Sequence, residues 1–301
     1  MDEHSVMFLT KFSFFLVLFV LCPLDSGSRS RCSAQMTGDY APSPSPSPSP
    51  APQSSSKFSE ADALDNVVYY FSLTSPPTIS SSFCDRQHHQ MDQSSLNSIN
   101  IACSNTIGPD NEWHITEITM ASVSLDGFIH PDITKLTYLQ TLDLSNNQLH
   151  DSIPSNLGDL SHLTILDLSS NQLTGTIPLS LGNLKNLTEL DLDQNFLTGI
   201  IPPSLGNLSS LQYLFLFFNK LSGAIPHELG ELSQLQILYL DDNELNGTLP
   251  KELGNLRKLE NCNWVTSNYL TGEVPKEYEQ LESLEVFHVL KSISLIANAV
   301  L

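Results

Sequence analysis

The stretch LTILDLSSNQLTGTIPLSLGNL, residues 163–184, decides the fold of this chain. Its leucines and its first Asn recur through the sequence at a fixed interval of 24 residues. The recurring positions are Leu139, Leu163, Leu187, Leu211, Leu235 and Leu259, and Asn147, Asn171, Asn195, Asn219 and Asn243. Self-similarity at this period predicts a solenoid, in which each unit forms one turn of a stacked array.

Each unit divides into a short strand, a bend and a return segment. In the strand, leucines alternate with other residues, so that the leucines point into the core and the residues between them point outward. Successive turns stack these strands into a parallel sheet with a spacing of about 4.8 Å. The repeated Asn lies at the bend, where its amide satisfies backbone groups that the sheet leaves unpaired. A single unit cannot bury its leucines, so the fold exists only as an array.

The pattern LxGxIPxxLGNL resembles that of plant extracellular leucine-rich repeat proteins, over about residues 58–289. The resemblance is closest to the ectodomains of leucine-rich repeat receptor-like kinases. It implies an α/β repeat solenoid, which is a curved right-handed array with a parallel β-sheet on the concave face and an N-terminal helical cap. We expect the repeats to occupy residues 113–284, as about seven turns of 24 residues, and a degenerate tail to follow at residues 285–301.

Three segments of different composition precede the repeats. Residues 1–28 have the character of a secretory signal peptide, because Lys11 precedes an apolar run that is shorter than the roughly 20 residues needed to span a bilayer. Residues 29–57 contain APSPSPSPSPAP, which predicts an extended or disordered linker and resembles plant hydroxyproline-rich wall glycoproteins. Residues 58–112 are expected to form the cap, since SEADAL resembles the opening helix of such caps.

The cysteine count is compatible with secretion. Removal of the signal peptide leaves Cys32, Cys84, Cys103 and Cys262, and four cysteines allow three pairings. In the caps of the family that the chain resembles, a cysteine pair closes the end of the core, which implies a bridge between Cys84 and Cys103. The pairing of Cys32 and Cys262 stays open.

Charge and motifs exclude several functions. The chain has 13 Lys and Arg against 33 Asp and Glu, a formal net charge of -20, so it would repel nucleic acid and attract basic partners. It has no Gly-rich phosphate loop and no kinase-type triplet. The segment CDRQHHQMD, residues 84–92, lacks the second ligand pair of a zinc site. We therefore expect no enzyme, no cofactor, no metal and no membrane-spanning segment.

The outward strand positions are the candidate ligand-binding site. In the fourth and fifth units they carry aromatic side chains with carboxylates beside them. The last unit is one residue longer than the others, and its outward positions include Trp264. The candidate residues are Tyr213, Phe215, Phe217, Tyr239, Trp264, Asp191, Asp193 and Asp241. An exposed aromatic cluster with charged neighbours is typical of an interface. The alternative is that adjacent rings only shield one another.

The extra residue of the last unit predicts a bulge near Cys262 or Asn263 and moves the bend Asn to Asn268. Asp143, Asp167 and Asp191 align across turns, but they stand on an open face without a nucleophile and are expected to be surface residues. Three N-x-Ser/Thr sites, at Asn186, Asn207 and Asn246, lie away from the outward strand positions and are candidate glycosylation sites.

These features favour a secreted recognition module that binds an extracellular protein, peptide or glycan on its concave face. The resemblance implies a location in the cell wall or apoplast, and an association with the plasma membrane through a partner such as a receptor-like kinase. Two alternatives are an enzyme inhibitor of the polygalacturonase-inhibiting type, which shares this repeat, and a structural wall protein held by its Ser-Pro segment.

Overall fold

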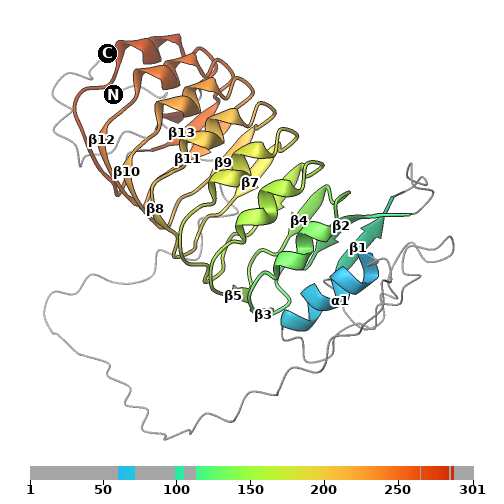
Figure 1. Cartoon of the computed structure of the whole chain (residues 1–301). Helices are drawn as coiled ribbons and strands as arrows, with labels where there is room; N and C mark the ends of the chain where they lie inside the picture. Colours follow the sequence, from blue (N-terminus) through green and yellow to red (C-terminus); the bar gives the residue numbers. More distant parts are fainter. Residues whose placement is uncertain (1–59, 72–98, 105–112, 265, 285, 288–301) are drawn as a thin grey trace, which may run out of the picture. The chain divides into compact units, whose positions relative to one another are not determined.

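The computed structural model describes residues 60–71, 99–104, 113–264, 266–284 and 286–287, all of which belong to one structural unit, Ser55–Leu301. Within this unit the turns stack side by side from the cap to the last turn (Figure 1). The predicted signal peptide, the Ser-Pro linker and nearly all of the predicted tail lie outside the described residues. None of the helices in the described part of the chain has the length and apolarity needed to cross a bilayer.

One face of the stack is a nine-stranded sheet with one strand from each turn. Its order is β1 (Asn100–Cys103), β2 (Ile115–Thr119), β4 (Thr141–Asp143), β6 (Ile165–Asp167), β7 (Glu189–Asp191), β9 (Tyr213–Phe215), β11 (Ile237–Tyr239), β13 (Asn261–Asn263) and β15 (Val286–Phe287). β1 runs antiparallel to β2, and every later pair is parallel. The pairs from β2 to β13 join residues 24 positions apart, so the predicted parallel sheet is confirmed.

Two smaller sheets line the flank of the stack. One contains β14 (Tyr269–Thr271), β12 (Glu244–Thr248), β10 (Lys220–Ala224) and β8 (Thr198–Gly199), and the other contains β3 (Asp126–Gly127) and β5 (Gln148–Leu149). Except for β3, whose turn has Val123 in place of the bend Asn, each of these strands follows the bend Asn of its turn. They pair the backbones of the return segments of adjacent turns.

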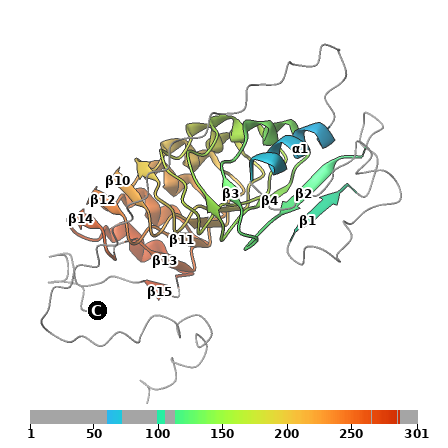
Figure 2. The same ribbon diagram turned by 90° about the horizontal axis from the view of Figure 1, so that it is seen from below.

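The remaining side of each turn is a short 3₁₀ helix, opposite the nine-stranded sheet (Figure 2). The helices are η2 (Pro131–Lys135), η3 (Ser155–Asp159), η4 (Leu179–Asn183), η5 (Pro203–Asn207), η6 (His227–Glu231), η7 (Lys251–Asn255) and η8 (Lys276–Gln280). From η3 onward a Pro in extended conformation occupies the N-cap, so the repeated Pro sets where each helix begins. At Gly182 a side chain would overlap the backbone oxygen of Ser204 in the next turn, which explains the repeated Leu-Gly step.

The core consists of the repeated leucines. In the turn formed by residues 163–184, the fully buried side chains are Leu163, Leu166, Leu168, Leu173 and Leu181. Each buried leucine contributes about 1.5–3 kcal/mol relative to an exposed one. The same positions are buried in the neighbouring turns, so one continuous core runs through the array.

The bend asparagines join consecutive turns, as predicted. The Nδ2 of Asn171 donates to Leu168 O at 3.2 Å in its own turn and to Leu144 O at 3.0 Å in the preceding turn. Its Oδ1 accepts from Leu149 N at 3.0 Å. Asn268 bonds in the same way to Leu240 O and Leu245 N, so it is the bend Asn of the longer unit.

The N-terminal end of the core is covered by α1 (Glu60–Tyr70). Its apolar face is buried and includes Leu64 and Val67. Glu60 ties the helix to β2, because its Oε2 accepts from Ile115 N at 2.8 Å and its Oε1 lies 3.0 Å from Nδ1 of His114. Cys103 ends β1, but Cys84 lies outside the described residues, so their pairing stays a prediction.

The predicted outward position of Trp264 is wrong. β13 keeps the 24-residue register of β11, so Cys262 pairs with Leu238 and faces the core at 0% exposure. Trp264 is 1% exposed, and its Nε1 donates to Leu238 O at 3.1 Å. The outward residues of this strand are Asn261 and Asn263.

The extra residue lies after the strand. Leu240 N donates to Asn263 O, 23 positions further on, whereas Asp242 N donates to Thr266 O, 24 positions further on. The insertion therefore falls between Asn263 and Thr266, and the predicted bulge is displaced beyond β13. This placement leaves the strand in register and allows the Trp264 ring to pack edge-on against Tyr278, with ring centroids 5.4 Å apart.

Candidate ligand-binding face

Aromatic side chains occupy outward positions on two adjacent strands of the nine-stranded sheet. Tyr213 and Phe215 flank the buried Leu214 on β9, and Tyr239 follows the buried Leu238 on β11. Tyr239 pairs directly with Phe215 across the strands. The predicted alternation of core and outward residues is thus confirmed for this part of the sheet. The outward side chains Tyr213, Phe215 and Tyr239 are half-buried.

Four rings form one connected aromatic cluster, defined as Phe215, Phe217, Phe218 and Tyr239. The ring centroids of Phe215 and Tyr239 are 5.6 Å apart, those of Phe217 and Tyr239 are 6.0 Å apart, and those of Phe217 and Phe218 are 5.7 Å apart. All three pairs meet edge-on, which is the favourable geometry for aromatic rings. Tyr213 lies on the same face, and its hydroxyl donates to Gln236 Oε1 at 3.1 Å.

Phe218 is a member of the cluster that was not among the predicted residues. It is 52% exposed and has a φ of 50°. The residue before the bend Asn is left-handed in every turn, and the other turns place small or polar residues there, namely Ser122, Asn146, Ser170, Gln194, Asp242 and Ser267. A bulky aromatic in that conformation is the outlier, and comparison of this column in the sequence would have revealed it.

Three carboxyl groups border the cluster and form the acidic border, defined as Asp191, Asp193 and Asp241. Asp191 pairs with Phe215 on the adjacent strand. Asp193 and Asp241 lie in the turns before and after Phe217, since Gln194 N donates to Phe217 O and Phe218 N donates to Asp241 O. Asp193 is only 6% exposed. The structure therefore brings together seven of the eight predicted residues, and Trp264 is the exception.

The acidic border differs from the carboxylates of the earlier turns. Asp143 and Asp167 each accept hydrogen bonds from the backbone N and the hydroxyl of a Ser two residues later. In the next turn Asp193 replaces that Ser, so Asp191 receives only the backbone N of Asp193, at 3.0 Å. The carboxyl of Asp193, a hydrogen-bond acceptor, thus occupies the position at which the earlier turns have a Ser hydroxyl that donates.

Burial and mutual repulsion shift the titration of the acidic border. Burial, strengthened by the charges of Asp193, Asp167 and Glu189, raises the pKa of Asp191 to about 8. Burial and the charges of Asp167 and Asp241 raise the pKa of Asp193 to about 7. Burial and the charge of Asp242 raise the pKa of Asp241 to about 6.

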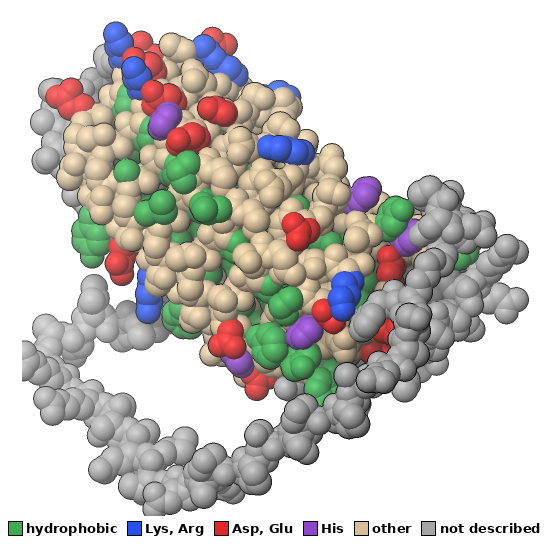
Figure 3. Space-filling view, viewed as in Figure 1, with side chains coloured by type: hydrophobic (Ala, Val, Ile, Leu, Met, Phe, Trp, Pro, Cys, Tyr) green, Lys and Arg blue, Asp and Glu red, His purple; other side chains and the backbone are tan. Residues whose placement is uncertain are grey.

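Cationic side chains lie away from this face. The described Lys and Arg residues are Lys135, Lys185, Lys220, Lys251, Arg257, Lys258 and Lys276, and none of them is on a strand of the nine-stranded sheet. Most are on the 3₁₀ helices or directly after them, and Figure 3 shows Lys and Arg side chains scattered over that side. Within the described ranges, no Lys, Arg or His forms an ion pair with the acidic border.

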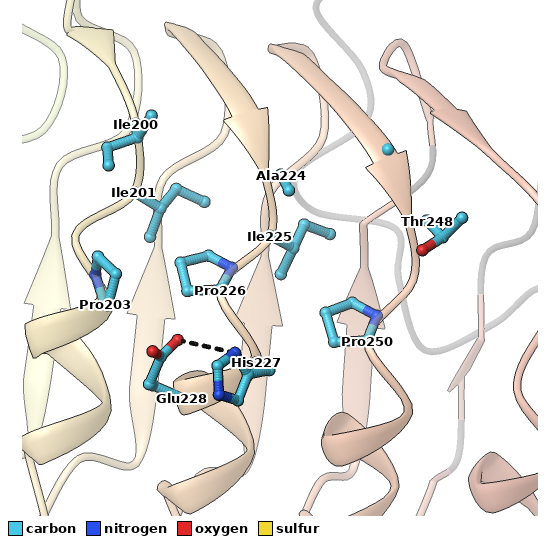
Figure 4. A pocket seen from close by; sticks show the side chains of 11 residues that line it. Ile200, Ile201, Pro203, Ala224, Ile225, Pro226, His227, Glu228, Thr248 and Pro250 are labelled. Carbon is cyan, nitrogen blue, oxygen red and sulfur yellow. Dashed lines mark ion pairs between the residues drawn. The ribbon is translucent and has the colours of Figure 1, made fainter.

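A shallow groove of about 670 Å³ lies on the flank (Figure 4). Isoleucines and prolines of three consecutive turns line it, and His227 and Glu228 lie at its edge with Nδ1 and Oε2 3.3 Å apart. Its apolar lining is formed largely by the repeated Ile-Pro step. No group of three or more potential metal ligands occurs in the part of the chain that the structure describes.

The three predicted glycosylation sites lie off the candidate face. Asn186, Asn207 and Asn246 are exposed, and they belong respectively to the segment after η4, to η5 and to β12. Glycans there would leave the nine-stranded sheet open. Their occupancy stays a prediction.

Comparison with known proteins agrees with this architecture. The profile of the leucine rich repeat family matches residues 137–197, 161–221 and 185–245. The chain therefore contains leucine-rich repeats, and its fold is similar to that of plant receptor-kinase ectodomains. No curated protein sequence matches it.

Three solved structures illustrate the similarity. PEPR1 with AtPEP1 has a TM-score of 0.63 and 30% identity over 74% of this chain and 30% of that chain. The plant peptide hormone receptor RGFR1 with RGF2 has a TM-score of 0.56 and 36% identity over 58% and 27% of the two chains. The ectodomain of the Arabidopsis thaliana receptor kinase GASSHO1/SCHENGEN3 with CASPARIAN STRIP INTEGRITY FACTOR 2 has a TM-score of 0.55 and 31% identity over 74% and 28%. This chain spans less than a third of each of these chains.

Proposed function

We propose that this chain is an extracellular recognition module that binds a peptide or a peptide segment of a protein on its nine-stranded sheet. The observation that carries the proposal is the aromatic cluster, which places four touching rings at outward positions of two consecutive turns. Soluble proteins seldom expose a contiguous apolar patch unless it contacts a partner. A glycan ligand would also stack on such rings, but the comparisons favour a peptide.

Two further facts support the proposal. A repeat sheet is rigid, so the outward side chains are already positioned and little ordering entropy opposes binding. The similar structures include a plant peptide hormone receptor in complex with RGF2. Location in the apoplast is part of the proposal and rests on the predicted signal peptide at residues 1–28. Mass spectrometry of the protein recovered from plant culture medium would test it, by giving the N-terminus and the glycan occupancy of Asn186, Asn207 and Asn246.

The binding proposal is tested by selection of an unbiased phage library of 12-residue peptides on the immobilised full chain. We expect a pool that binds the wild type and loses binding to the Phe215→Ser/Tyr239→Ser double variant. The matched control is Thr141→Ser, an outward change on β4 that should retain binding. Circular dichroism verifies that each variant is folded. Failure to select a pool, or a pool that binds the folded double variant equally well, would overturn the proposal.

A further inference from the structure

The chemistry of the aromatic cluster and the acidic border restricts the ligand that this face can take. The argument rests on the proposed function, because it assumes that a peptide binds there. Three properties of the face carry it: an exposed aromatic held in an unfavourable backbone conformation, carboxyl groups that pair with none of the described cations, and the interleaving of the carboxyls with the rings.

The contacts of Phe218 do not explain how this residue would stabilise the fold. Its left-handed backbone costs free energy for any residue other than Gly, and least for Asn and Asp. Burial does not compensate, because half of its side chain is exposed. Among the described residues, its ring packs against that of Phe217. A ligand that covers Phe218 would supply the missing burial, so we expect the ligand to carry an apolar group at this edge of the sheet.

The acidic border is a concentration of carboxyl groups with which no Lys, Arg or His of the described segments forms an ion pair. Asp191 and Asp193 lie together at one side of Phe217, and Asp241 lies at the other. Asp167, Glu189 and Asp242 add negative charge around them. The Oδ1 atom of Asp241 is buried and has no hydrogen-bond partner among the described residues.

The strand register interleaves the carboxyls with the rings. Outward residues two positions beyond the strand ends form a column across three consecutive turns, in the order Asp193, Phe217, Asp241. In the next column Asp191 pairs with Phe215, which pairs with Tyr239. A ligand group that lies over these rings is therefore within one strand spacing of a carboxyl, roughly 5 Å.

We infer that the face binds a peptide segment in which a Lys or Arg stands next to an apolar or aromatic residue. The apolar side chain packs on Phe215, Phe217 and Phe218. The neighbouring cation lies at the acidic border, where it forms charge-assisted hydrogen bonds with the carboxylates and contacts the ring faces. A bound cation stabilises the ionised form of these carboxyls, whereas an acidic peptide gains no such contact, so charge as well as shape selects the ligand.

The test uses the sequences of the peptide pool selected on the full chain. We expect enrichment of Lys or Arg adjacent to Phe, Tyr, Trp, Leu or Ile. A synthetic copy of the strongest peptide, labelled with fluorescein, is then compared by anisotropy with a copy whose Lys and Arg are replaced by Gln. We expect the Gln copy to bind the wild type at least tenfold more weakly.

Two variants of the protein locate the two halves of the site. Asp193→Ser restores the residue type of Ser169 in the preceding turn, and it should weaken the basic peptide about tenfold while leaving the Gln copy nearly unchanged. Phe218→Asn should weaken both peptides several-fold without lowering the melting temperature. Ser170→Asn, at the same left-handed position two turns earlier, is the control and should have no effect.

The outcomes separate this inference from the proposed function. A pool that requires Phe215 and Tyr239 but is neutral or acidic in composition would overturn the inference and leave the proposed function standing. Equal binding of the basic and Gln peptides would also overturn it. If no pool requires Phe215 and Tyr239, the proposed function fails first and the inference fails with it.

Discussion

Two turns of the array, the one that contains Asp167 and the one that contains Phe215, have the same core and different outward faces. Leu166 and Leu214 are both fully buried, and both turns contribute one strand to the same parallel sheet. On the outward face, the first turn has the carboxylate of Asp167, which accepts a hydrogen bond from the Ser169 hydroxyl, and the second has the ring of Phe215, which packs on Tyr239. The fold thus depends on the core and the bend that the turns share, and the outward positions are free to differ in function.

The largest effect is expected in the core and should be equal in the two turns. Leu166→Ala and Leu214→Ala each remove a fully buried side chain, and each should lower the free energy of unfolding by about 2–5 kcal/mol. Urea unfolding followed by circular dichroism measures both. A difference between the two variants much larger than about 1 kcal/mol would show that the aromatic turn is not the structural equivalent of its neighbour.

The bend asparagines should come next. Asn171→Ala and Asn219→Ala each leave buried backbone groups of two turns without partners, at a cost of about 1–3 kcal/mol per variant. Gln172→Ala, an exposed change beside the first Asn, is the control and should be neutral within about 0.5 kcal/mol. Neutrality of the Asn variants would mean that water replaces their hydrogen bonds.

The acidic border predicts that the stability of the protein depends on pH. The pKa values of Asp191 and Asp193 in the folded protein, about 8 and about 7, lie above the ordinary value of 3.8. The folded state therefore binds more protons than the unfolded state between about pH 4 and pH 8, and stability falls as pH rises through that window.

Asp193→Ser is expected to flatten this slope. It should raise stability at pH 8 on the order of 1–2 kcal/mol, since one pKa unit corresponds to about 1.4 kcal/mol and side-chain relaxation absorbs part of the shift. At pH 4 the variant should differ little from the wild type. Thermal melts at the two pH values provide the measurement, and equal effects of the substitution at both would contradict a role for ionisation.

The smallest effect concerns the left-handed position. Phe218→Asn should leave stability unchanged or raise it by about 0.5–1 kcal/mol, because Asn adopts this backbone more readily than Phe. For a domain of this size the gain corresponds to a rise in melting temperature of about 1–4 °C. The control Ser170→Asn should shift the melting temperature less than Phe218→Asn does. A clear loss of stability in Phe218→Asn alone would indicate that the aromatic ring supports the fold.

Much of the site could be predicted because it follows from the repeat register. Once the 24-residue interval is known, every strand residue is assigned to the core or to the outward face, and Tyr213, Phe215 and Tyr239 follow directly. Asp193 also falls outward, but its near-complete burial does not follow from the pattern, because it depends on the size of the neighbouring side chains in adjacent turns.

Trp264 shows where the pattern stops being sufficient. The longer unit contains one residue more than the others, and spacing alone allows that residue to lie before or after the strand. Placement after the strand keeps β13 paired in register with β11 and buries a large aromatic side chain, which is worth several kcal/mol. The pairing and the burial, and not the spacing, decide the position.

The sequence by itself determined the array, its register, the inward leucines and the bend asparagines, because these depend on a period that each turn repeats. Tertiary structure alone decided where the insertion falls, how deeply the acidic border is buried and that Phe218 is exposed with a left-handed backbone. These features depend on contacts between unlike side chains of adjacent turns. A repeated pattern describes what the turns share, and the ligand-binding face is formed where they differ.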